Sequence, residues 1–192
     1  MATAEVDIAN SALAKLGAPL IEALTDTVRA AVLCNERYPI LRKKLLASHP
    51  WNFATKRVSL AATADEPIFE YDMEFALPTG CLRVLDTDLS EGEEWEIENG
   101  VSNGRVLLCN ADAVKIKYIK DITDVTLFPP HFEECLALLL AADISYAITQ
   151  NNTVKQDMWS AYKNEVREAR SIDAQEAQKS ALDTNPWIDV RW

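Results

Sequence analysis

The acidic residues between positions 91 and 98 are the densest group in this chain with a capacity for chemistry. They are Glu91, Glu93, Glu94, Glu96 and Glu98. Two carboxylates beside an aromatic platform such as Trp95 are what a glycoside hydrolase requires. However, Trp95 and Ile97 alternate with the acids, which is typical of a hairpin with one face packed and one face in water. We expect the solvated hairpin and keep a glycan hydrolase as the alternative.

The remaining reactive residue types give little support for catalysis. His49 and His131 each stand beside a proline, and neither has a second histidine or cysteine at metal-ligand spacing. The four cysteines contain no CxxC pair, which predicts reduced, semi-buried thiols: Cys34, Cys81, Cys109 and Cys135. No glycine-rich nucleotide motif is present in the sequence. We therefore expect no catalytic residue, no metal and no cofactor, and a protein that is not an enzyme.

The C-terminal segment carries an unusual concentration of apolar side chains. The residues that we expect to dock there are Trp187, Ile188, Val190, Arg191 and Trp192. Burying two indoles contributes roughly 7 to 12 kcal/mol before costs. Ordering eight residues at about 1 to 2 kcal/mol each offsets most or all of that gain. A single tail therefore binds weakly, whereas many tails on one ring bind firmly because later contacts are intramolecular.

Charge argues against ordinary nucleic-acid binding. The 192 residues carry a net charge of -11, and positions 51–128 hold seven basic against fifteen acidic residues. A DNA-binding protein gains affinity from clustered cations, and the one such cluster here is Arg42-Lys43-Lys44. A conduit through which DNA slides is compatible with weak attraction or mild repulsion. Cys135–Ala142, the longest nearly unbroken apolar stretch, is too short for a membrane span.

The elements that position these residues can be predicted from hydrophobic spacing. Helical spacing covers positions 6–16, and a second helix begins after Thr25 or Asp26 and continues to about Ser48, with a bend or break at Pro39. Positions 53–128 show period-two alternation. Within them we expect a long strand over 69–77 that buries its odd-numbered residues. A strand over 114–118 would offer Lys115 and Lys117 to the acidic face of that strand.

Two further predictions complete the fold. Strands around 95–97 and 105–108 form a hairpin, since Asn-Gly pairs lie between them. After Pro129-Pro130 a helix that is apolar nearly all round forms the buried centre, and a one-sided helix follows over about 154–169. We therefore predict an α+β fold: an α-helical bundle (1–50 and 129–180) interrupted by an antiparallel β insert (51–128), with an extended C-terminal docking tail (181–192).

Three stretches of the sequence resemble a known family. The opening DIANSALAKLG, the segment AAVLCNERY at 30–38 and the block LLASHPWNFA at 45–54 resemble the head-to-tail adaptor (connector) proteins of short-tailed bacteriophages, the tail tubular protein A family. Phe75-Ala76-Leu77-Pro78, the segment 81–85 and the segment 118–124 are similar to that family as well. The resemblance covers roughly residues 3 to 150, and its most distinctive block is HPWNFA.

The resemblance implies a structural virion protein at the head-tail junction, made in the host bacterial cytoplasm. Copies would form a ring, usually a dodecamer, whose partners are the capsid portal protein and the tail nozzle protein (tail tubular protein B). The helical part would point to the portal, the β part to the nozzle, and double-stranded DNA would pass through without specific binding. The C-terminal residues would dock on the portal, and the Glu91–Glu98 acids would face the lumen or the nozzle. The alternatives are a tail-associated glycan hydrolase and a generic protein-interaction module.

Overall fold

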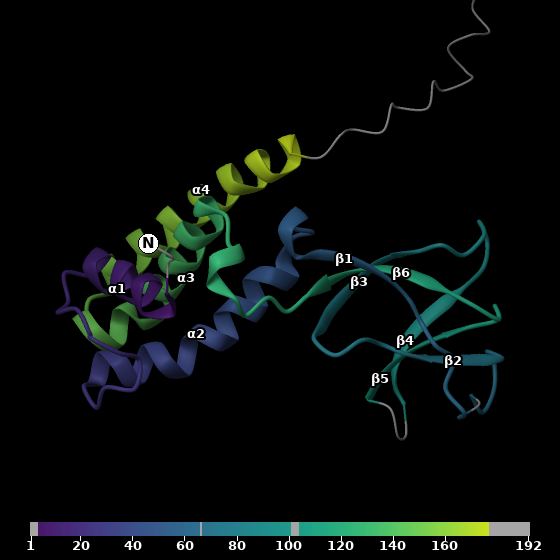
Figure 1. Ribbon diagram of the computed structural model, residues 1–192. Helices are drawn as coiled ribbons and strands as arrows, with labels where there is room; N and C mark the ends of the chain where they lie inside the picture. Colours follow the sequence, from purple (N-terminus) through teal and green to yellow (C-terminus); the bar gives the residue numbers. More distant parts are fainter. Residues whose placement is uncertain (1–3, 66, 101–103, 177–192) are drawn as a thin grey trace, which may run out of the picture.

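The computed structural model describes residues 4–65, 67–100 and 104–176, and it has the predicted α+β fold. A helical part and a β part lie side by side, so the molecule is elongated (Figure 1). The helices are α1 (Glu5–Lys15), α2 (Arg29–Ser48), α3 (Pro130–Thr149) and α4 (Asn152–Gln175), with short 3-10 turns at Asn52–Ala54 and Val125–Leu127. The strands are β1 (Thr55–Ser59), β2 (Met73–Ala76), β3 (Cys81–Thr87), β4 (Trp95–Gly100), β5 (Gly104–Cys109) and β6 (Lys115–Lys120).

Helix α3 is the centre of the helical part. Its side chains are buried on nearly every side, as the all-round apolar composition predicts, and α1, α2 and α4 pack against it. Helix α4 packs one face on this core through Met158, Tyr162 and Val166. The Asn151 side chain accepts hydrogen bonds from the N–H groups of Thr153 and Val154 and so caps the start of α4.

Helix α2 differs from its predicted form at two places. It begins at Arg29, whereas the Asp26 carboxylate accepts hydrogen bonds from the N–H groups of Glu22 and Ala23 and orders the preceding turn. It also continues through Pro39 as one helix, so the predicted break is wrong, whereas the predicted bend stays a prediction. Both Pro39 and Asn35, one turn earlier, are exposed, so the carbonyl that loses its partner faces water.

The β part is built from two three-stranded antiparallel sheets that pack face to face. Their strand orders are β1-β6-β3 and β2-β5-β4 (Figure 1). The core between them includes Val84 and Ile116 from the first sheet and Phe75 and Leu107 from the second. The predicted hairpin is present, because β4 pairs with β5 from Trp95 opposite Cys109 to Gly100 opposite Gly104.

The predicted strand over 69–77 is wrong for its first half. The strand is only Met73–Ala76, and Phe69 is 76% exposed. The cause is local, because Glu70 adopts a positive φ of 75° and the N–H of Tyr71 donates to the Phe69 carbonyl, which turns the chain. Glu74, predicted to face water, is buried and accepts a hydrogen bond from the Thr63 hydroxyl.

The predicted partner of the Lys115–Lys117 strand is also wrong. Strand β6 lies between β1 and β3, and β2 belongs to the other sheet. Lys117 therefore stands opposite Arg57 of β1 on one side and Asp86 of β3 on the other. Sequence alternation identifies the exposed face of a strand, but the choice of neighbour depends on contacts between distant segments.

None of the helices in the described parts of the chain is long and apolar enough to cross a lipid bilayer.

Candidate interaction surfaces

The acidic segment lies in β4 and in the turn that precedes it. Trp95 and Ile97 pack against the core between the sheets, and the glutamates on either side of them are exposed, as the alternation predicts. Glu91 and Glu93 belong to the turn between β3 and β4, where the Glu93 carboxylate accepts a hydrogen bond from the Ser90 N–H. The structure therefore spreads the five acids along an exposed edge strand and its turn.

The pKa of Tyr71 reflects negative charge on the outer side of sheet β2-β5-β4. Partial burial raises the pKa of its phenol, and the nearby negative charge of Glu96 raises it further. Three more carboxylates act in the same direction on this pKa: Glu70, Glu94 and Glu98. The outer face of sheet β2-β5-β4 is thus a region of concentrated negative charge.

Among the described residues, the predicted acids line two separate hollows of the β part. Glu98 lines a hollow of about 170 Å³ together with Glu70 and Glu74. Ligand pockets usually measure about 300 to 1,000 Å³, so this hollow is smaller than a typical ligand site. Glu93 and Glu94 line a separate hollow of about 310 Å³ beside Asn110. Glu91 and Glu96 line neither hollow, so the five acids do not converge on one site.

Both histidines lie where the helical and β parts meet. The His49 ring contacts Trp51 edge-on at 4.8 Å, and its Nε2 lies 3.3 Å from Asp173 of α4. Burial lowers the pKa of His49, and this effect outweighs the attraction of Asp173, which raises it. The His131 ring makes a tilted contact with Trp51, with the ring centroids 6.2 Å apart. Both rings thus have packing roles.

The His-Pro-Trp-Asn-Phe-Ala block forms an aromatic cluster at this junction. Trp51 is fully buried, and its indole N–H donates to the Leu45 carbonyl at 3.0 Å. Phe53 and Phe132 contact each other edge-on at 4.9 Å, and Phe132 also contacts Trp51. The most distinctive block of the sequence is therefore a structural joint, with ring contacts in preferred edge-to-face geometry.

Polar contacts reinforce the same joint. Asp173 accepts a hydrogen bond from the Asn52 N–H at 3.0 Å, and the Asn52 side chain donates to the Asp173 carbonyl at 2.5 Å. Arg42 of α2 reaches Asp121, beyond the end of β6, at 3.1 Å. These contacts connect the two parts of the chain at positions far apart in sequence. Sequence reasoning missed them because single charged residues carry no signal of their partners.

The burial of Arg42 changes the meaning of the one basic cluster in the sequence. Its side chain is 6% exposed and pairs with Asp121 and, at 3.8 Å, with Glu5. Lys43 also lies 3.8 Å from Asp121. Arg42 is thus engaged within the chain and is not free to neutralise a phosphate backbone, whereas Lys43 is 56% exposed and only loosely paired.

Basic residues that are scattered in the sequence gather on the outer face of sheet β1-β6-β3. A hollow of about 550 Å³ is lined there by Arg57, Lys115 and Lys117, with Asp86 and Asp88. Lys115 lies 3.1 Å from Asp88, and the backbone and side-chain hydrogen bonds of Lys115 lower the pKa of that carboxyl. Among the described residues, Arg57 and Lys117 have no ion-pair partner. The contributing strands are distant in sequence, so no linear motif indicates this surface.

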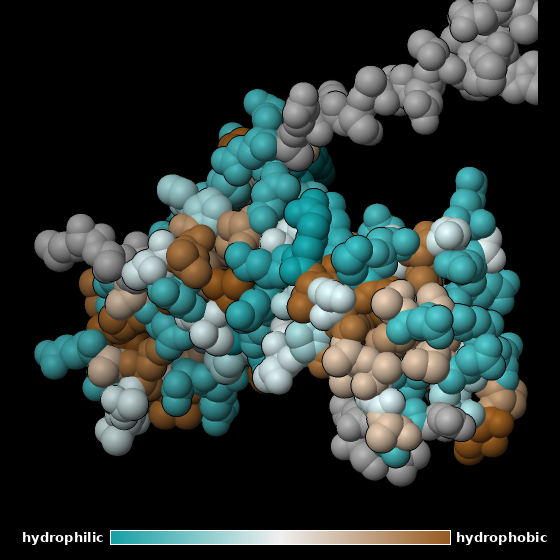
Figure 2. Space-filling view, turned by 45° about the vertical axis from the view of Figure 1, so that its right-hand side comes forward, coloured by the Kyte–Doolittle hydropathy of each residue, from teal (hydrophilic) through white to brown (hydrophobic). Residues whose placement is uncertain are grey.

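Large apolar side chains are exposed at both ends of the molecule. Leu20, Val28 and Val32 lie at the start of α2 and in the segment before it, at the far end of the helical part (Figure 1). Ile68 and Phe69, 97% and 76% exposed, lie in the loop between β1 and β2 at the other end. Figure 2 shows hydrophobic surface on both parts. Four more large apolar side chains are exposed: Ile40, Leu127, Tyr146 and Ile172.

The predicted docking residues Trp187, Ile188, Val190, Arg191 and Trp192 lie outside the described residues. The described parts of the chain contain no group of three or more histidine, cysteine or acidic side chains arranged to hold a metal ion. No model of a known protein family matches the sequence, and no curated protein matches it.

Proposed function

We propose that this chain is a structural adaptor that forms a ring between the capsid portal and the tail nozzle of a short-tailed bacteriophage. The observation that carries the proposal is the position of exposed apolar side chains at both ends of one elongated molecule. Isolated exposed apolar residues are ordinary, but groups of them at exposed ends are typical of protein contacts. A molecule with contact surfaces at two ends is suited to joining two partners.

The joint between the two parts supports a mechanical role. Arg42 and Asp121 connect α2 to the end of β6, and Asn52 and Asp173 connect α4 to the start of the β part. Trp51 fills the space between them with no exposed surface. Packed interiors transmit displacement with little compression. Force applied at one end of the adaptor would therefore reach the other end without unfolding the joint.

The charge distribution supports passage of DNA without capture. The net charge is -11, and Arg42 of the one basic sequence cluster is engaged with Asp121 inside the chain. Exposed negative charge acts over about 8 to 10 Å at ordinary ionic strength, so acids near a lumen would keep the duplex from adhering. The acidic turn and β4 remain candidates for that role or for the surface that meets the nozzle.

The test compares the full chain with a variant that ends at position 184, in binding to purified portal protein followed by negative-stain imaging. We expect the full chain to give rings on the portal, and the truncated chain to fold but lose portal binding. Rings that form equally well with the truncated chain would remove the docking role of residues 185–192. A full chain that stays monomeric and unbound in the presence of portal would contradict the adaptor function and favour a generic interaction module.

The glycan hydrolase remains a second candidate because Glu98, Glu70 and Glu74 share one hollow. Double replacement of Glu70 and Glu98 by glutamine tests it on a panel of polysaccharides, because both side chains line that hollow. Activity in the parent that disappears in the variant would favour the hydrolase. An inactive parent leaves the adaptor as the proposal.

A further inference from the structure

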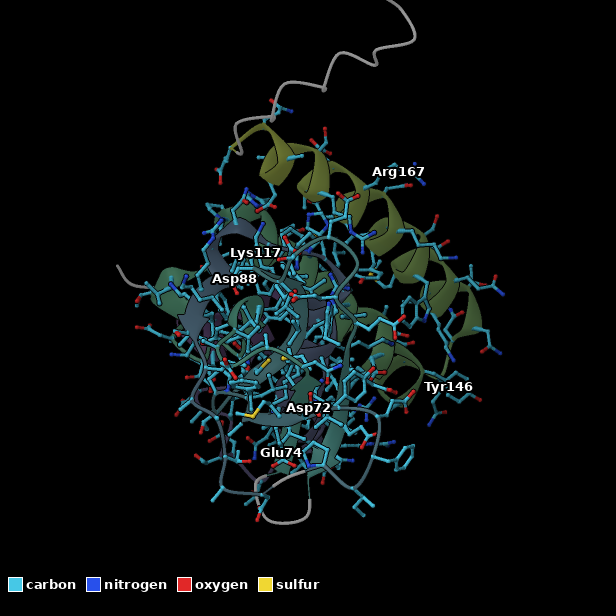
Figure 3. The ribbon with its side chains drawn as sticks, turned by 90° about the vertical axis from the view of Figure 1, so that its right-hand side faces the viewer. Asp72, Glu74, Asp88, Lys117, Tyr146 and Arg167 are labelled. Atoms are coloured by element: carbon cyan, nitrogen blue, oxygen red, sulfur yellow. The ribbon has the colours of Figure 1, made fainter. Side chains whose placement is uncertain are left out.

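The two outer faces of the β part differ in charge: the hollow on sheet β1-β6-β3 is lined by three basic and two acidic side chains, and the outer face of sheet β2-β5-β4 is acidic. In Figure 1 the sheet β1-β6-β3 lies above the sheet β2-β5-β4, and in Figure 3 Lys117 and Asp88 lie on the upper side of the β part and Asp72 and Glu74 on the lower. The upper sheet directs Arg57 and Lys117 outward, and the lower sheet directs Glu96 and Glu98 outward. A copy of this chain therefore presents complementary charges on opposite sides.

We propose that copies of this chain associate head to tail through these two faces. The acidic face of β4 in one copy contacts the basic hollow on the outer face of sheet β1-β6-β3 in the next copy. This inference rests on the proposed function, because it names the surfaces through which the ring would assemble. Its occupant is a second copy of this chain, chosen because the charges match and both surfaces are present on every copy.

The basic face has cations that the described chain leaves without partners. Arg57 and Lys117 stand directly opposite each other on neighbouring antiparallel strands. Like charges in this position repel each other and destabilise the pairing. Asp86 lies opposite Lys117 on its other side, but the two form no ion pair within the described residues. An acidic partner placed over Arg57 and Lys117 would relieve the repulsion between them.

The spacing of two carboxylates on the acidic face is similar to that of the two cations on the basic face. Glu96 and Glu98 lie two residues apart on the same face of β4, which separates them by about 6.5 to 7 Å. Arg57 and Lys117 have Cβ atoms about 4.5 to 5.5 Å apart, and both side chains are long. Strand β4 has β5 as its neighbour on one side and none on the other in the described sheet, so its outer side is accessible. Each carboxylate can then meet one cation.

The geometry of such a contact leads to a ring. Each copy uses its basic face toward one neighbour and its acidic face toward the other, so the interface is heterologous. Heterologous contacts produce a closed ring when the rotation between copies closes, and an open filament when it does not. The individual ion pairs are exposed and therefore weak and sensitive to salt. The assignment places Glu96 and Glu98 between copies and leaves Glu91, Glu93 and Glu94 as candidates for the lumen or the nozzle.

Charge reversal on each face tests the inference. One variant carries Arg57→Glu and Lys117→Glu, and the other carries Glu96→Lys and Glu98→Lys. Self-association of the full chain is measured by sedimentation at high protein concentration and about 50 mM salt. We expect each variant alone to weaken self-association about tenfold or more, because both of its outer faces then have the same sign. An equal mixture of the two variants should recover it, since every contact then joins opposite charges.

Matched controls separate the proposed faces from a general effect of charge. Lys163→Glu with Arg167→Glu, and Glu36→Lys with Glu168→Lys, make the same changes in net charge at exposed helical positions. They should leave self-association unchanged. A wild-type chain that stays monomeric under these conditions, or a mixture of variants that fails to recover, would overturn the inference. Portal binding is measured separately. If either face variant forms rings on the portal as well as the wild type does, the proposed faces are wrong but the adaptor function stands. If the wild type self-associates through these faces but does not bind the portal, the faces stand and the adaptor function is contradicted.

Discussion

The guanidinium of Arg42, on α2, lies 3.1 Å from a carboxylate oxygen of Asp121, just beyond β6, and the two side chains are only 6% and 13% exposed. The pair joins the helical part to the β part across 79 positions of the sequence. If one of these buried charges lost its partner, water could not replace the lost interaction. The pair therefore holds the joint more by the cost of breaking it than by its net attraction.

Removing one member of this pair should be costly. We expect Asp121→Ala to lower the free energy of unfolding by about 3 kcal/mol, because it leaves the Arg42 charge buried without its nearest partner. The double variant Arg42→Met with Asp121→Leu should lose clearly less, since no charge is then stranded. Urea unfolding followed by circular dichroism measures both. A single variant within about 0.5 kcal/mol of the wild type would show that water reaches the joint.

The lowered pKa of His49 predicts a loss of stability in mild acid. Burial, opposed by Asp173, holds the pKa below the ordinary value of about 6.5 that the imidazole has in the unfolded chain. Between the two pKa values, His49 is therefore protonated in the unfolded chain and neutral in the folded chain. The contribution of His49 to stability is complete above about pH 6.5 and is lost as the pH falls through the lower, folded value.

The variant His49→Gln isolates this effect from the other titrating groups. Urea unfolding is compared at about pH 7.5 and about pH 5.5, and we expect the wild type to lose more stability over this interval than the variant. Equal losses in the two proteins would mean that the imidazole keeps its ordinary pKa in the folded state. A larger loss in the variant would mean that Asp173 raises the pKa of His49 above that value.

The helices and the β4–β5 hairpin follow from sequence because their signals are local. The apolar composition of α3 and the alternation around Trp95 depend on neighbours within one turn or one strand. The failures depend on distant contacts or on a single backbone angle. Nothing in the sequence around Glu70 requires its positive φ, and Arg42 reads as part of a surface cluster although Asp121 buries it. The basic face was missed because Arg57 and Lys117 meet only across paired strands.

The four cysteines should differ in reactivity in the folded protein. Burial raises the pKa of Cys34 to about 11 and that of Cys135 to about 12, and Cys109 is also buried with a raised pKa. Cys81 is half-buried, and the charge of Arg105 opposes the rise of its pKa. We expect Cys81 to react with a thiol reagent about tenfold faster than the others. The rate of thiol modification measures this. The fast phase should disappear in Cys81→Ser, and the three remaining thiols of that variant should all react once it is unfolded in urea.

The cap of α4 offers a prediction with an adjacent control. Asn151 accepts hydrogen bonds from two otherwise free N–H groups at the start of the helix. Asn151→Ala should lower the free energy of unfolding by about 1 kcal/mol. Asn151→Ser should lower it by much less, because serine is also a good cap. Asn152→Ala, at the first helical position, should have little effect because that side chain forms no cap. Equal losses at 151 and 152 would show that the loss does not come from the cap hydrogen bonds, because alanine has the higher helix propensity.

The exposed apolar residues at the two ends should serve different partners if the chain is an adaptor. Ile68→Ser with Phe69→Ser changes only the loop between β1 and β2, where the two side chains are 97% and 76% exposed, so the stability of the fold should change little. We expect this variant to keep portal binding and to weaken nozzle binding about tenfold or more, because a contact loses two large apolar anchors. Pull-down with each purified partner measures this.

The reciprocal variant carries Val28→Ser and Val32→Ser at the opposite end of the molecule. It should weaken portal binding and leave nozzle binding intact, while Leu127→Ser, an exposed apolar residue away from both ends, should affect neither. The two ends are separated by the joint around Trp51, so each contact should fail alone. If either variant weakened both partners equally, the ends would not act as separate contact surfaces, and the resemblance that assigns the helical part to the portal would lose its structural basis.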